Sequence, residues 1–230
     1  MSGILAAHQP NYLPWAGFFF KLGQAEVWVI ADDVQYTSHG LINRNRIRTP
    51  GGWQWLSVPV LSRGRGRQRI GEVETDPAST WRRKHWKALQ CNYRRAPFFA
   101  RHAPFLEALY QREWPCLVGL NLELCLYMMR QFDIDLELRR SSQLVLRQER
   151  TGRLVDMALA CGAAVYLAGG GASRDYLEEE EFRRAGIECR FSDFAHPLYP
   201  QCWPGFQPNM TALDLLFNCG PDSRKVLFGH

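Results

Sequence analysis

The sequence lacks any apolar run of the roughly 18 residues that a membrane-spanning helix needs. Its most apolar segment, residues 115–129, is interrupted by Asn121 and Glu123. No Lys or Arg precedes Lys21, so the N-terminal segment has no basic region of the kind that opens a secretory signal peptide. From these absences we expect a cytoplasmic protein that makes no membrane contact.

Paired cysteines and the common nucleophile and nucleotide motifs are also missing. The seven cysteines are scattered, and no two form a C-x-x-C pair. Such spacing disfavours a disulfide framework and a zinc site, and it is typical of reduced thiols. The chain has no G-x-S-x-G, G-x-G-x-x-G or P-loop motif. We therefore expect neither a serine nor a cysteine nucleophile, no metal and no cofactor.

Aromatic side chains and positive charge, in contrast, are plentiful. The 230 residues are 46% hydrophobic, 22% charged and 13% aromatic, with eight Trp and a net charge of +5. This composition is that of a globular protein. The aromatic residues suit a well-filled core or the walls of a cleft for a polar ligand. The charge suits an anionic ligand such as a nucleotide-sugar, a carrier-bound acyl group or RNA, although solubility alone also explains it.

Strand and helix patterns alternate at both ends of the chain, around a helical middle. Buried strands are predicted at residues 4–7, 27–31 and 163–168, and further strands at 136–138 and 187–191. Helices are predicted near residues 14–24, 78–94, 97–112, 115–132, 151–161 and 211–218. Residues 37–48 are predicted to be a polar connection, and strands at 53–60 and 70–75 are predicted to pair. We expect an α/β fold with one domain, residues 1–230, a mixed and largely parallel central sheet, and an α-helical insertion at about 78–132.

Residues 63–69, which we call the arginine loop, contain four Arg and two Gly. A segment of this composition cannot pack into a core, so we expect a mobile basic loop. It is either a solvated hairpin tip or an arm that attracts an anionic ligand in a salt-sensitive way.

The segment from His8 to Trp15 follows the first predicted strand and precedes a helix, which is where α/β folds place ligand sites. Two prolines fix its path and hold the polar side chains of His8, Gln9 and Asn11. His8 is a candidate general base near neutral pH. The alternative is a loop histidine whose ring is bound by a backbone carbonyl.

Further polar groups are predicted near the same edge. Asp32 and Asp33 end the second strand, where a carboxylate orients His8, binds a cation or caps a following turn. Arg44 suits a carboxylate or phosphate as a bidentate partner, but a plain surface loop explains it equally well. Gly169–Gly171 come directly after a strand, where they either hold a phosphate or form a tight turn.

Several motifs together resemble those of the WbqC-like family. The opening motif is His8-Gln9-Pro10-Asn11-Tyr12-Leu13-Pro14-Trp15, with Gly17 after it. There follow, in order, Asp32-x-x-Gln35, Asn43-Arg44-x-x-Ile47, Trp55 before Pro59, Tyr93 with Pro97-Phe98-Phe99, Tyr166-Leu167-Ala168-Gly169-x-Gly171-Ala172, Tyr199-x-Gln201, Phe206-x-Pro208 and Thr211-x-x-Asp214-Leu215-Leu216-Phe217-Asn218-x-Gly220. No cysteine belongs to these motifs, which weakens a route through a protein thioester.

The resemblance implies modification of a sugar or an amine in polysaccharide O-antigen or natural-product biosynthesis. The positions that carry over by motif are His8, Gln9, Asn11, Asp32, Gln35, Asn43, Arg44, Tyr199, Gln201 and Asp214. Two aromatic residues of the opening motif, Tyr12 and Trp15, flank this polar set.

The leading hypothesis is an N-acyl- or aminoacyltransferase that acts on an amino-sugar nucleotide or another small amine. His8 removes a proton from the amine, and Asp32 orients or charge-balances His8. Asn11 and Asn43 donate hydrogen bonds to the developing oxyanion. Substrate contacts are expected from Gln9, Tyr12, Trp15, Gln35, Arg44, Tyr199, Gln201 and Asp214. An acyl or aminoacyl carrier protein and an aminoacyl-tRNA are both compatible as donor with the net charge.

Two other functions remain open at this point. One is a non-catalytic protein that binds a sugar nucleotide or a carrier-bound intermediate and presents it to a partner enzyme. The other is an amide or ester hydrolase in which His8 and Asp32 activate water.

Overall fold

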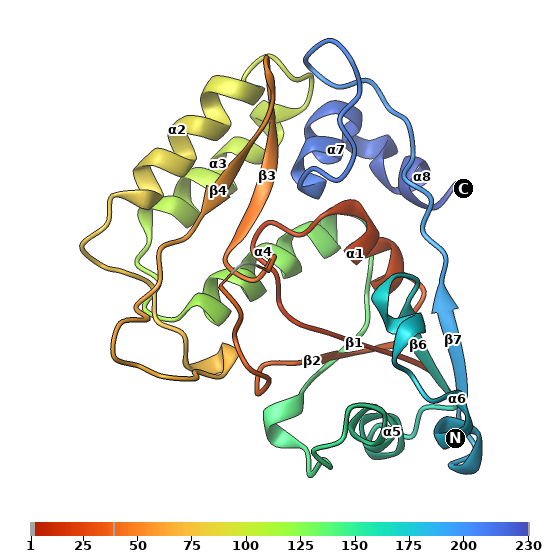
Figure 1. Ribbon diagram of the computed structural model, residues 1–230. Helices are drawn as coiled ribbons and strands as arrows, with labels where there is room; N and C mark the ends of the chain where they lie inside the picture. The colour runs from red at the N-terminus through yellow and green to blue at the C-terminus, as the bar shows by residue number, and fades with distance from the viewer. Residues whose placement is uncertain (1–2, 39, 230) are drawn as a thin grey trace. The chain divides into compact units, whose positions relative to one another are not determined.

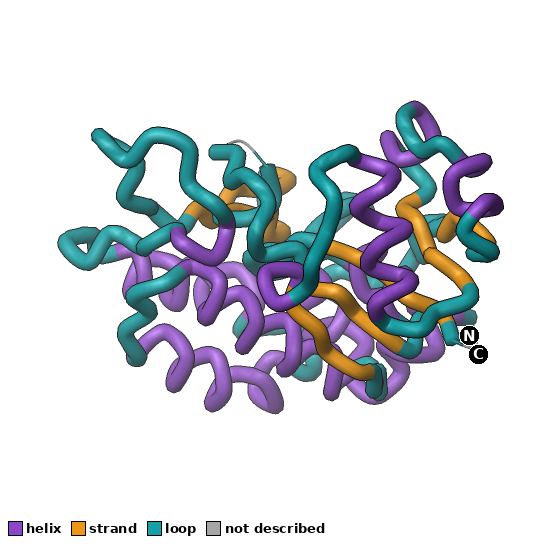
Figure 2. The backbone as a smooth tube through the Cα atoms, turned by 90° about the horizontal axis from the view of Figure 1, so that it is seen from below, coloured by secondary structure: helices purple, strands orange, loops and turns teal. Residues whose placement is uncertain are grey.

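The computed structural model describes the backbone of residues 3–38 and 40–229. Its residues form two compact units that alternate along the chain. Unit 1 comprises Met1–Gln9, Gly17–Val34 and Ile134–Ala195, and unit 2 comprises Pro10–Ala16, Gln35–Asp133 and His196–His230. Figure 2 shows how helices and strands alternate with connecting loops along this backbone.

Unit 1 is built on a parallel sheet of five strands in the order β5-β2-β1-β6-β7. The strands are β1 (Ile4–His8), β2 (Val27–Ile30), β5 (Glu137–Arg140), β6 (Val165–Gly169) and β7 (Glu188–Ser192). Neighbouring strands are in parallel register, for example His8 opposite Ile30 and Tyr166 opposite Cys189. The central strands are short and apolar, as expected where a sheet is covered on both faces.

Helices cover both faces of this sheet (Figure 1). On one face, α1 (Ala16–Leu22) packs Phe18 edge-on against Trp28 of β2, with ring centroids 5.5 Å apart. On the other face, α5 (Arg150–Ala160) and α6 (Glu179–Arg184) form an apolar cluster with the strands. Tyr166 stacks there on Phe182 at 5.2 Å. Two 3-10 turns complete the unit: η2 (Ser141–Gln143) after β5 and η3 (Ala172–Asp175) after β6.

Unit 2 combines helices with an antiparallel ribbon of β3 (Arg44–Thr49) and β4 (Gly52–Ser57). Its helices are α2 (Trp81–Tyr93), α3 (Phe99–Gln111), α4 (Leu117–Gln131), α7 (Ala212–Cys219) and α8 (Ser223–Phe228), with 3-10 turns η1 (Ile70–Glu72) and η4 (Gly220–Asp222). The inner face of the ribbon is buried through Asn45, Ile47 and Leu56.

Polar side chains inside unit 2 are hydrogen-bonded to one another. The hydroxyl of Tyr12 is 2.8 Å from Nδ1 of His85 and 2.6 Å from the hydroxyl of Tyr110. Asn121 of α4 is fully buried, and its amide donates to the carbonyls of Pro10 at 2.8 Å and Ile42 at 2.7 Å. This amide holds two loop segments that are far apart in sequence.

The α/β class and the strands of the parallel sheet are confirmed, and three expectations need correction. The central sheet is wholly parallel, because the antiparallel pair forms a separate ribbon. The predicted polar connection 37–48 contains β3. Asn45 and Ile47 point inward and alternate with arginines on the other face, but the polar Asn45 breaks the apolar alternation by which a strand is recognised. Residues 70–75 contain η1 in place of a strand, because Ile70 and Val73 are both buried at a spacing of three residues, and the predicted pairing with residues 53–60 is present only as an isolated bridge between Val60 and Thr75.

None of the helices in the described part of the chain is long and apolar enough to cross a membrane.

The buried histidines of unit 2 make stability dependent on pH. Burial lowers the pKa of both His85 and His102 to about 4. Between pH 6.5 and 4 the unfolded chain binds protons at these residues and the native chain does not, so stability falls as the pH falls. We expect each histidine to lower the free energy of unfolding by about 2 kcal/mol between pH 7 and pH 5, measured by urea unfolding.

His85→Gln is the variant that isolates this effect, because glutamine keeps a polar side chain but does not titrate. The variant should lose about 2 kcal/mol less than the unsubstituted protein over the same pH interval. An equal loss in both proteins would show that burial does not lower the pKa of His85 in the native state.

Candidate functional site at the carboxyl edge of the parallel sheet

The order of the strands in unit 1 defines a topological switch point between β1 and β6. The chain leaves β1 toward α1 on one face of the sheet, and it leaves β6 toward α6 on the other. In open parallel sheets a crevice opens outside the carboxyl ends of two such strands, and ligands bind there. In this chain those ends are His8 and Gly169.

His8, the last residue of β1, is half-buried with its ring edge-on to Phe18 at 4.7 Å. Its Nδ1 lies 2.9 Å from the carbonyl oxygen of Gln9. A carbonyl only accepts, so Nδ1 carries the proton and Nε2 keeps its lone pair. Burial, together with the charge of Lys21, lowers the pKa of His8 to about 4. The ring is therefore neutral at physiological pH, with Nε2 able to accept a proton.

The charge of Lys21, on α1, acts on His8. It is only 6% exposed, and its ammonium donates a hydrogen bond of 2.9 Å to the carbonyl of Ala7. Burial lowers the pKa of Lys21 to about 8. A buried ammonium beside the end of β1 favours the neutral form of His8 and the approach of a negative group.

Asp32, two residues past β2, is tied to the turn that follows β5. Its carboxylate accepts from the backbone N–H of Ser142 at 3.0 Å, from the hydroxyl of Ser142 at 2.9 Å and from the hydroxyl of Ser141 at 3.2 Å. The guanidinium of Arg140 lies 3.7 Å away. These contacts cap η2, a turn 109 positions further along the chain, and not the turn that directly follows β2. The ring nitrogen Nδ1 of His8 is held by Gln9 and not by Asp32.

Asp33 forms an ion pair with Arg153 of α5 and accepts a hydrogen bond from Ser141. Burial alone would raise the pKa of the Asp33 carboxyl, but the hydrogen bonds from Arg153 and Ser141 lower it below its usual value. The two adjacent carboxylates and Ser141 therefore form a fixed polar cluster at the carboxyl edge of β2 and β5.

Gly169–Gly171 form the other side of the switch point. A Cβ on Gly170 would lie 2.4 Å from the carbonyl oxygen of Ser192, at the end of β7. The connection after β6 thus approaches the neighbouring strand closely, which only glycine allows. A Cβ on Gly169 would instead meet the hydroxyl of Ser173 at 3.6 Å, an ordinary contact.

Three of the predicted substrate-binding residues meet inside unit 2. The fully buried carboxylate of Asp214, on α7, accepts from the hydroxyl of Tyr199 and from the amide of Gln201, both at 2.8 Å. Burial raises the pKa of Asp214, although these hydrogen bonds, Tyr93 and the charge of Arg48 act in the opposite direction. The other oxygen, Oδ1, is buried and takes no hydrogen bond from the described residues.

This cluster ties the irregular segment after residue 196 to α7. Gln201 also donates to the carbonyl of Gln207 at 3.0 Å and accepts from its N–H at 2.8 Å. The guanidinium of Arg48 is buried and donates to the carbonyls of Pro204 and, at 3.0 Å, of Gly205. The thiol of Cys202 has its pKa raised to about 11 by burial, so it is protonated.

The remaining predicted residues lie in different surroundings of unit 2. Asn11 is buried, and its carbonyl accepts a weak hydrogen bond from the thiol of Cys125 at 3.7 Å. Asn43 is 8% exposed and donates to the carbonyl of Val58 at 2.9 Å, while its Oδ1 is buried without a partner among the described residues. Trp15 is half-buried and forms a bridge with Thr211.

Of the other three, Tyr12 is fully buried with its hydroxyl already bonded inside unit 2. Gln35 is exposed and pairs with Arg69 through the backbone. Arg44 begins β3 with its guanidinium 4.4 Å from the ring centre of Trp55.

Several residues that contact or act on His8, Asp32, Asp33 and Asp214 were not predicted from the sequence. Lys21 looks like an ordinary helix residue, and Ser141 and Ser142 have no motif around them. Arg153 lies 120 positions from Asp33. Tyr93 was part of a motif, but nothing in that motif indicated contact with Asp214. Among the described residues, no group of three His, Cys, Asp or Glu side chains is placed to hold a metal ion.

Comparison with known proteins gives a family over almost the whole chain. The model of the WbqC-like protein family matches residues 9–226, which include segments of both units. A protein of Mycobacterium tuberculosis (strain ATCC 25618 / H37Rv), named Uncharacterized protein Rv1507c, is 36% identical over 225 residues, covering 97% of this chain and 96% of its own. No solved structure matches the chain.

Replacing Gly170 tests the close approach at the switch point. In Gly170→Ala the new methyl group overlaps the Ser192 carbonyl, and we expect a loss of about 1–3 kcal/mol in unfolding free energy. Gly169→Ala is the matched control, because its Cβ has room. Thermal unfolding of both variants measures the difference. Equal melting temperatures would contradict the crowding at Gly170.

Removing the hydroxyl of Tyr199 tests the buried carboxylate cluster. Tyr199→Phe leaves the buried carboxyl of Asp214 with one hydrogen-bond donor fewer, and we expect a loss of about 1–3 kcal/mol in urea unfolding. Tyr176→Phe is the control, because Tyr176 is 41% exposed and its substitution should cost about 0.5 kcal/mol or less. If the two variants are equally stable, the Tyr199 hydrogen bond adds nothing to the fold.

Proposed function

Because the chain belongs to the WbqC-like protein family, we propose that it is a transferase that attaches an acyl or aminoacyl group to the amine of an amino sugar. The acceptor is an amino-sugar nucleotide, and its nucleotide part binds at the switch point of unit 1. The product belongs to polysaccharide O-antigen or natural-product biosynthesis. This proposal combines the resemblance of the motifs with the geometry of the parallel sheet.

The observation that carries the proposal is the state of His8 at the end of β1. The switch point is where a parallel sheet binds a nucleotide, and His8 borders it directly. Its Nδ1 is held by the Gln9 carbonyl, so Nε2 is the nitrogen that accepts a proton. No hydrogen bond from the described residues occupies Nε2.

The reaction needs one proton acceptor. The amine nitrogen forms a bond to the acyl carbon of the donor, and the bond from that carbon to the donor's leaving group breaks. Nε2 of His8 accepts the proton that the nitrogen loses, and it returns this proton to the leaving group. Lys21, which is cationic below about pH 8, offsets negative charge on the nucleotide or on the leaving group.

Asp32 has a positioning role in this proposal. Its carboxylate is used by Ser141 and Ser142, so it fixes the turn after β5 at the edge where the ligand binds. The predicted oxyanion donors Asn11 and Asn43 belong to unit 2 and stay predictions.

A second candidate function is binding without catalysis. A histidine with a pKa of about 4 is a weak base, since a general base works best with a pKa near the working pH. The same residues then recognise a sugar nucleotide and present it to a partner enzyme. Ligand binding by calorimetry, with no product by mass spectrometry from any acyl or aminoacyl donor, would favour this candidate.

Replacement of His8 separates the two functions. In His8→Ala we expect the rate of amide formation to fall about 100-fold to 10,000-fold, because the proton acceptor is lost, while nucleotide-sugar affinity changes only a few-fold. Product is measured by mass spectrometry and affinity by calorimetry. His196→Ala is the matched control, because this half-buried histidine belongs to unit 2 and has no role in the proposal.

The pH profile gives a second readout. Since the pKa of His8 is about 4, the rate should not fall between pH 7 and pH 5.5 through protonation of this residue. Full turnover by folded His8→Ala would overturn the catalytic role of His8.

A further inference from the structure

The outer face of the β3–β4 ribbon carries a row of alternating arginine and tryptophan side chains. Arg46 lies opposite Trp55 in the register, and Arg44 and Trp53 lie two positions away on the same face. The guanidinium of Arg44 is 4.4 Å from the ring centre of Trp55, and that of Arg46 is 5.1 Å from Trp53 and 5.8 Å from Trp55. We call these four residues the Arg-Trp face.

The indoles of this face are open to solvent. Trp53 is 43% exposed and Trp55 is 39% exposed, and the two rings meet edge-to-face at 5.7 Å. The inner face of the ribbon already anchors the strands to the core, because Asn45, Ile47 and Leu56 are buried. The exposed surfaces of Trp53 and Trp55 therefore do not contribute to packing in unit 2.

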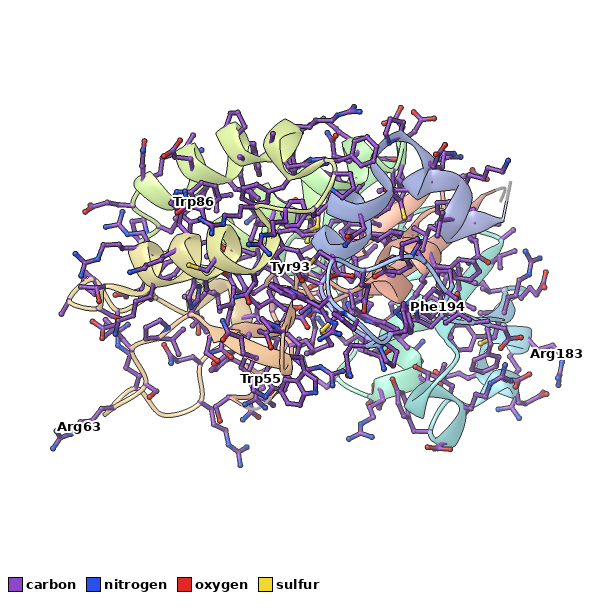
Figure 3. All side chains as sticks on the ribbon, turned by 90° about the horizontal axis from the view of Figure 1, so that it is seen from above. Trp55, Arg63, Trp86, Tyr93, Arg183 and Phe194 are labelled. Atoms are coloured by element: carbon purple, nitrogen blue, oxygen red, sulfur yellow. The ribbon has the colours of Figure 1, made fainter. Side chains whose placement is uncertain are left out.

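The charged side chains of the segment that contains this face are all positive. Between Gln35 and Gly71 the chain has seven Arg and neither Asp nor Glu. Arg48 is used inside unit 2 and Arg65 pairs with Glu74 at 2.7 Å. Figure 3 shows Arg63 extending outward at the end of its loop.

Contacts through Tyr36 connect the Arg-Trp face with the arginine loop. The charge of Arg44 acts on the hydroxyl of Tyr36 and lowers its pKa, against the larger effect of burial. The backbone N–H of Tyr36 donates to the carbonyl of Gln68 at 2.9 Å, and Gln35 pairs with Arg69. The exposed indoles and the arginine loop thus belong to one basic surface of unit 2.

We propose that the Arg-Trp face and the arginine loop bind single-stranded RNA. Unpaired bases stack on the exposed faces of Trp53 and Trp55, and the flanking guanidinium groups bind phosphates and stack on bases. The arginine loop holds the phosphates that follow. The choice of RNA over DNA rests on the proposed function, because an aminoacyl group is carried on the unpaired 3′ end of a tRNA.

An acidic carrier protein fits this surface less well. Such a partner would use the positive charge of the arginines, but it offers no planar rings to two solvent-exposed indoles. Single-stranded RNA supplies both the phosphates and the rings, so it matches both features of the surface.

The experiment measures binding of a short unstructured RNA labelled with fluorescein, by fluorescence anisotropy. We expect Trp53→Thr with Trp55→Thr to weaken binding by roughly tenfold for each base stack that is lost. Threonine keeps the strand propensity of both positions. Tyr176→Thr is the matched control, because this exposed aromatic residue of unit 1 also lies under an arginine, Arg150 at 5.3 Å, and its loss should leave RNA affinity unchanged.

The charge contribution is measured separately by salt dependence. Arg63→Gln with Arg67→Gln should reduce the slope of log affinity against log salt by about 1.4, since each phosphate contact to a single strand contributes about 0.7. Arg183→Gln with Arg184→Gln, on α6 of unit 1, removes the same charge and should leave the slope unchanged.

The proposal is overturned if the RNA does not bind at low salt, or if the double tryptophan variant binds it as tightly as the unsubstituted protein. It is also overturned if heparin and an acidic carrier protein displace the labelled RNA but unlabelled RNA does not. Quenching of tryptophan fluorescence by the RNA in the unsubstituted protein gives an independent measurement if the ribbon variants fail to fold. His8→Ala should bind the RNA normally, so failure of the transfer reaction and failure of RNA binding are distinguishable. Equal affinity for the DNA of the same sequence would keep the surface and remove the link to an aminoacyl-tRNA.

Discussion

A parallel sheet has to cover both of its faces, and in unit 1 this constraint determines where chemistry can occur. Because α1 covers one face and α5 and α6 the other, the chain leaves β1 and β6 in opposite directions. Sheets of this topology bind ligands outside two such strand ends. His8 occupies one of them, and its neutral state follows from the same packing, since Phe18 and Lys21 of α1 lie against the ring or act on it.

Unit 2 depends on polar side chains that are fully buried. Asn121 of α4 and Arg48 of β3 each bind backbone carbonyls that are distant in sequence, and Asp214 of α7 binds Tyr199 and Gln201 of the irregular segment. Long loops cannot satisfy their own carbonyl and N–H groups when they are buried, so a side chain with several donors or acceptors has to do it. This explains why the segment after residue 196, which is rich in proline and aromatic residues, has a defined path.

The central strands β1, β2 and β6 of unit 1 were predictable from sequence because apolar runs such as Val27–Ile30 are explained by burial alone. β3 was not, because polar residues occupy both of its faces and the inward Asn45 is satisfied by the distant carbonyl of Leu13 at 2.7 Å. The meeting of Tyr199, Gln201 and Asp214 agrees with their joint membership in the family motifs. The contacts of Asp32 with Ser141 and Ser142 link positions 109 and 110 residues apart, and no local pattern encodes such a distance.

β3 places three arginines at alternate positions on one face, and their surroundings separate their roles. Arg48 lies at the end of the strand that residues 204 and 205 cover, and its guanidinium is enclosed by carbonyl oxygens. Toward the start of the strand, the guanidinium groups of Arg44 and Arg46 instead lie near indoles that are partly exposed to solvent. A buried guanidinium needs a full set of acceptors, whereas a partly exposed one over an aromatic ring does not. The same residue type therefore holds the fold together at one end of the ribbon and contributes to the proposed RNA-binding surface at the other.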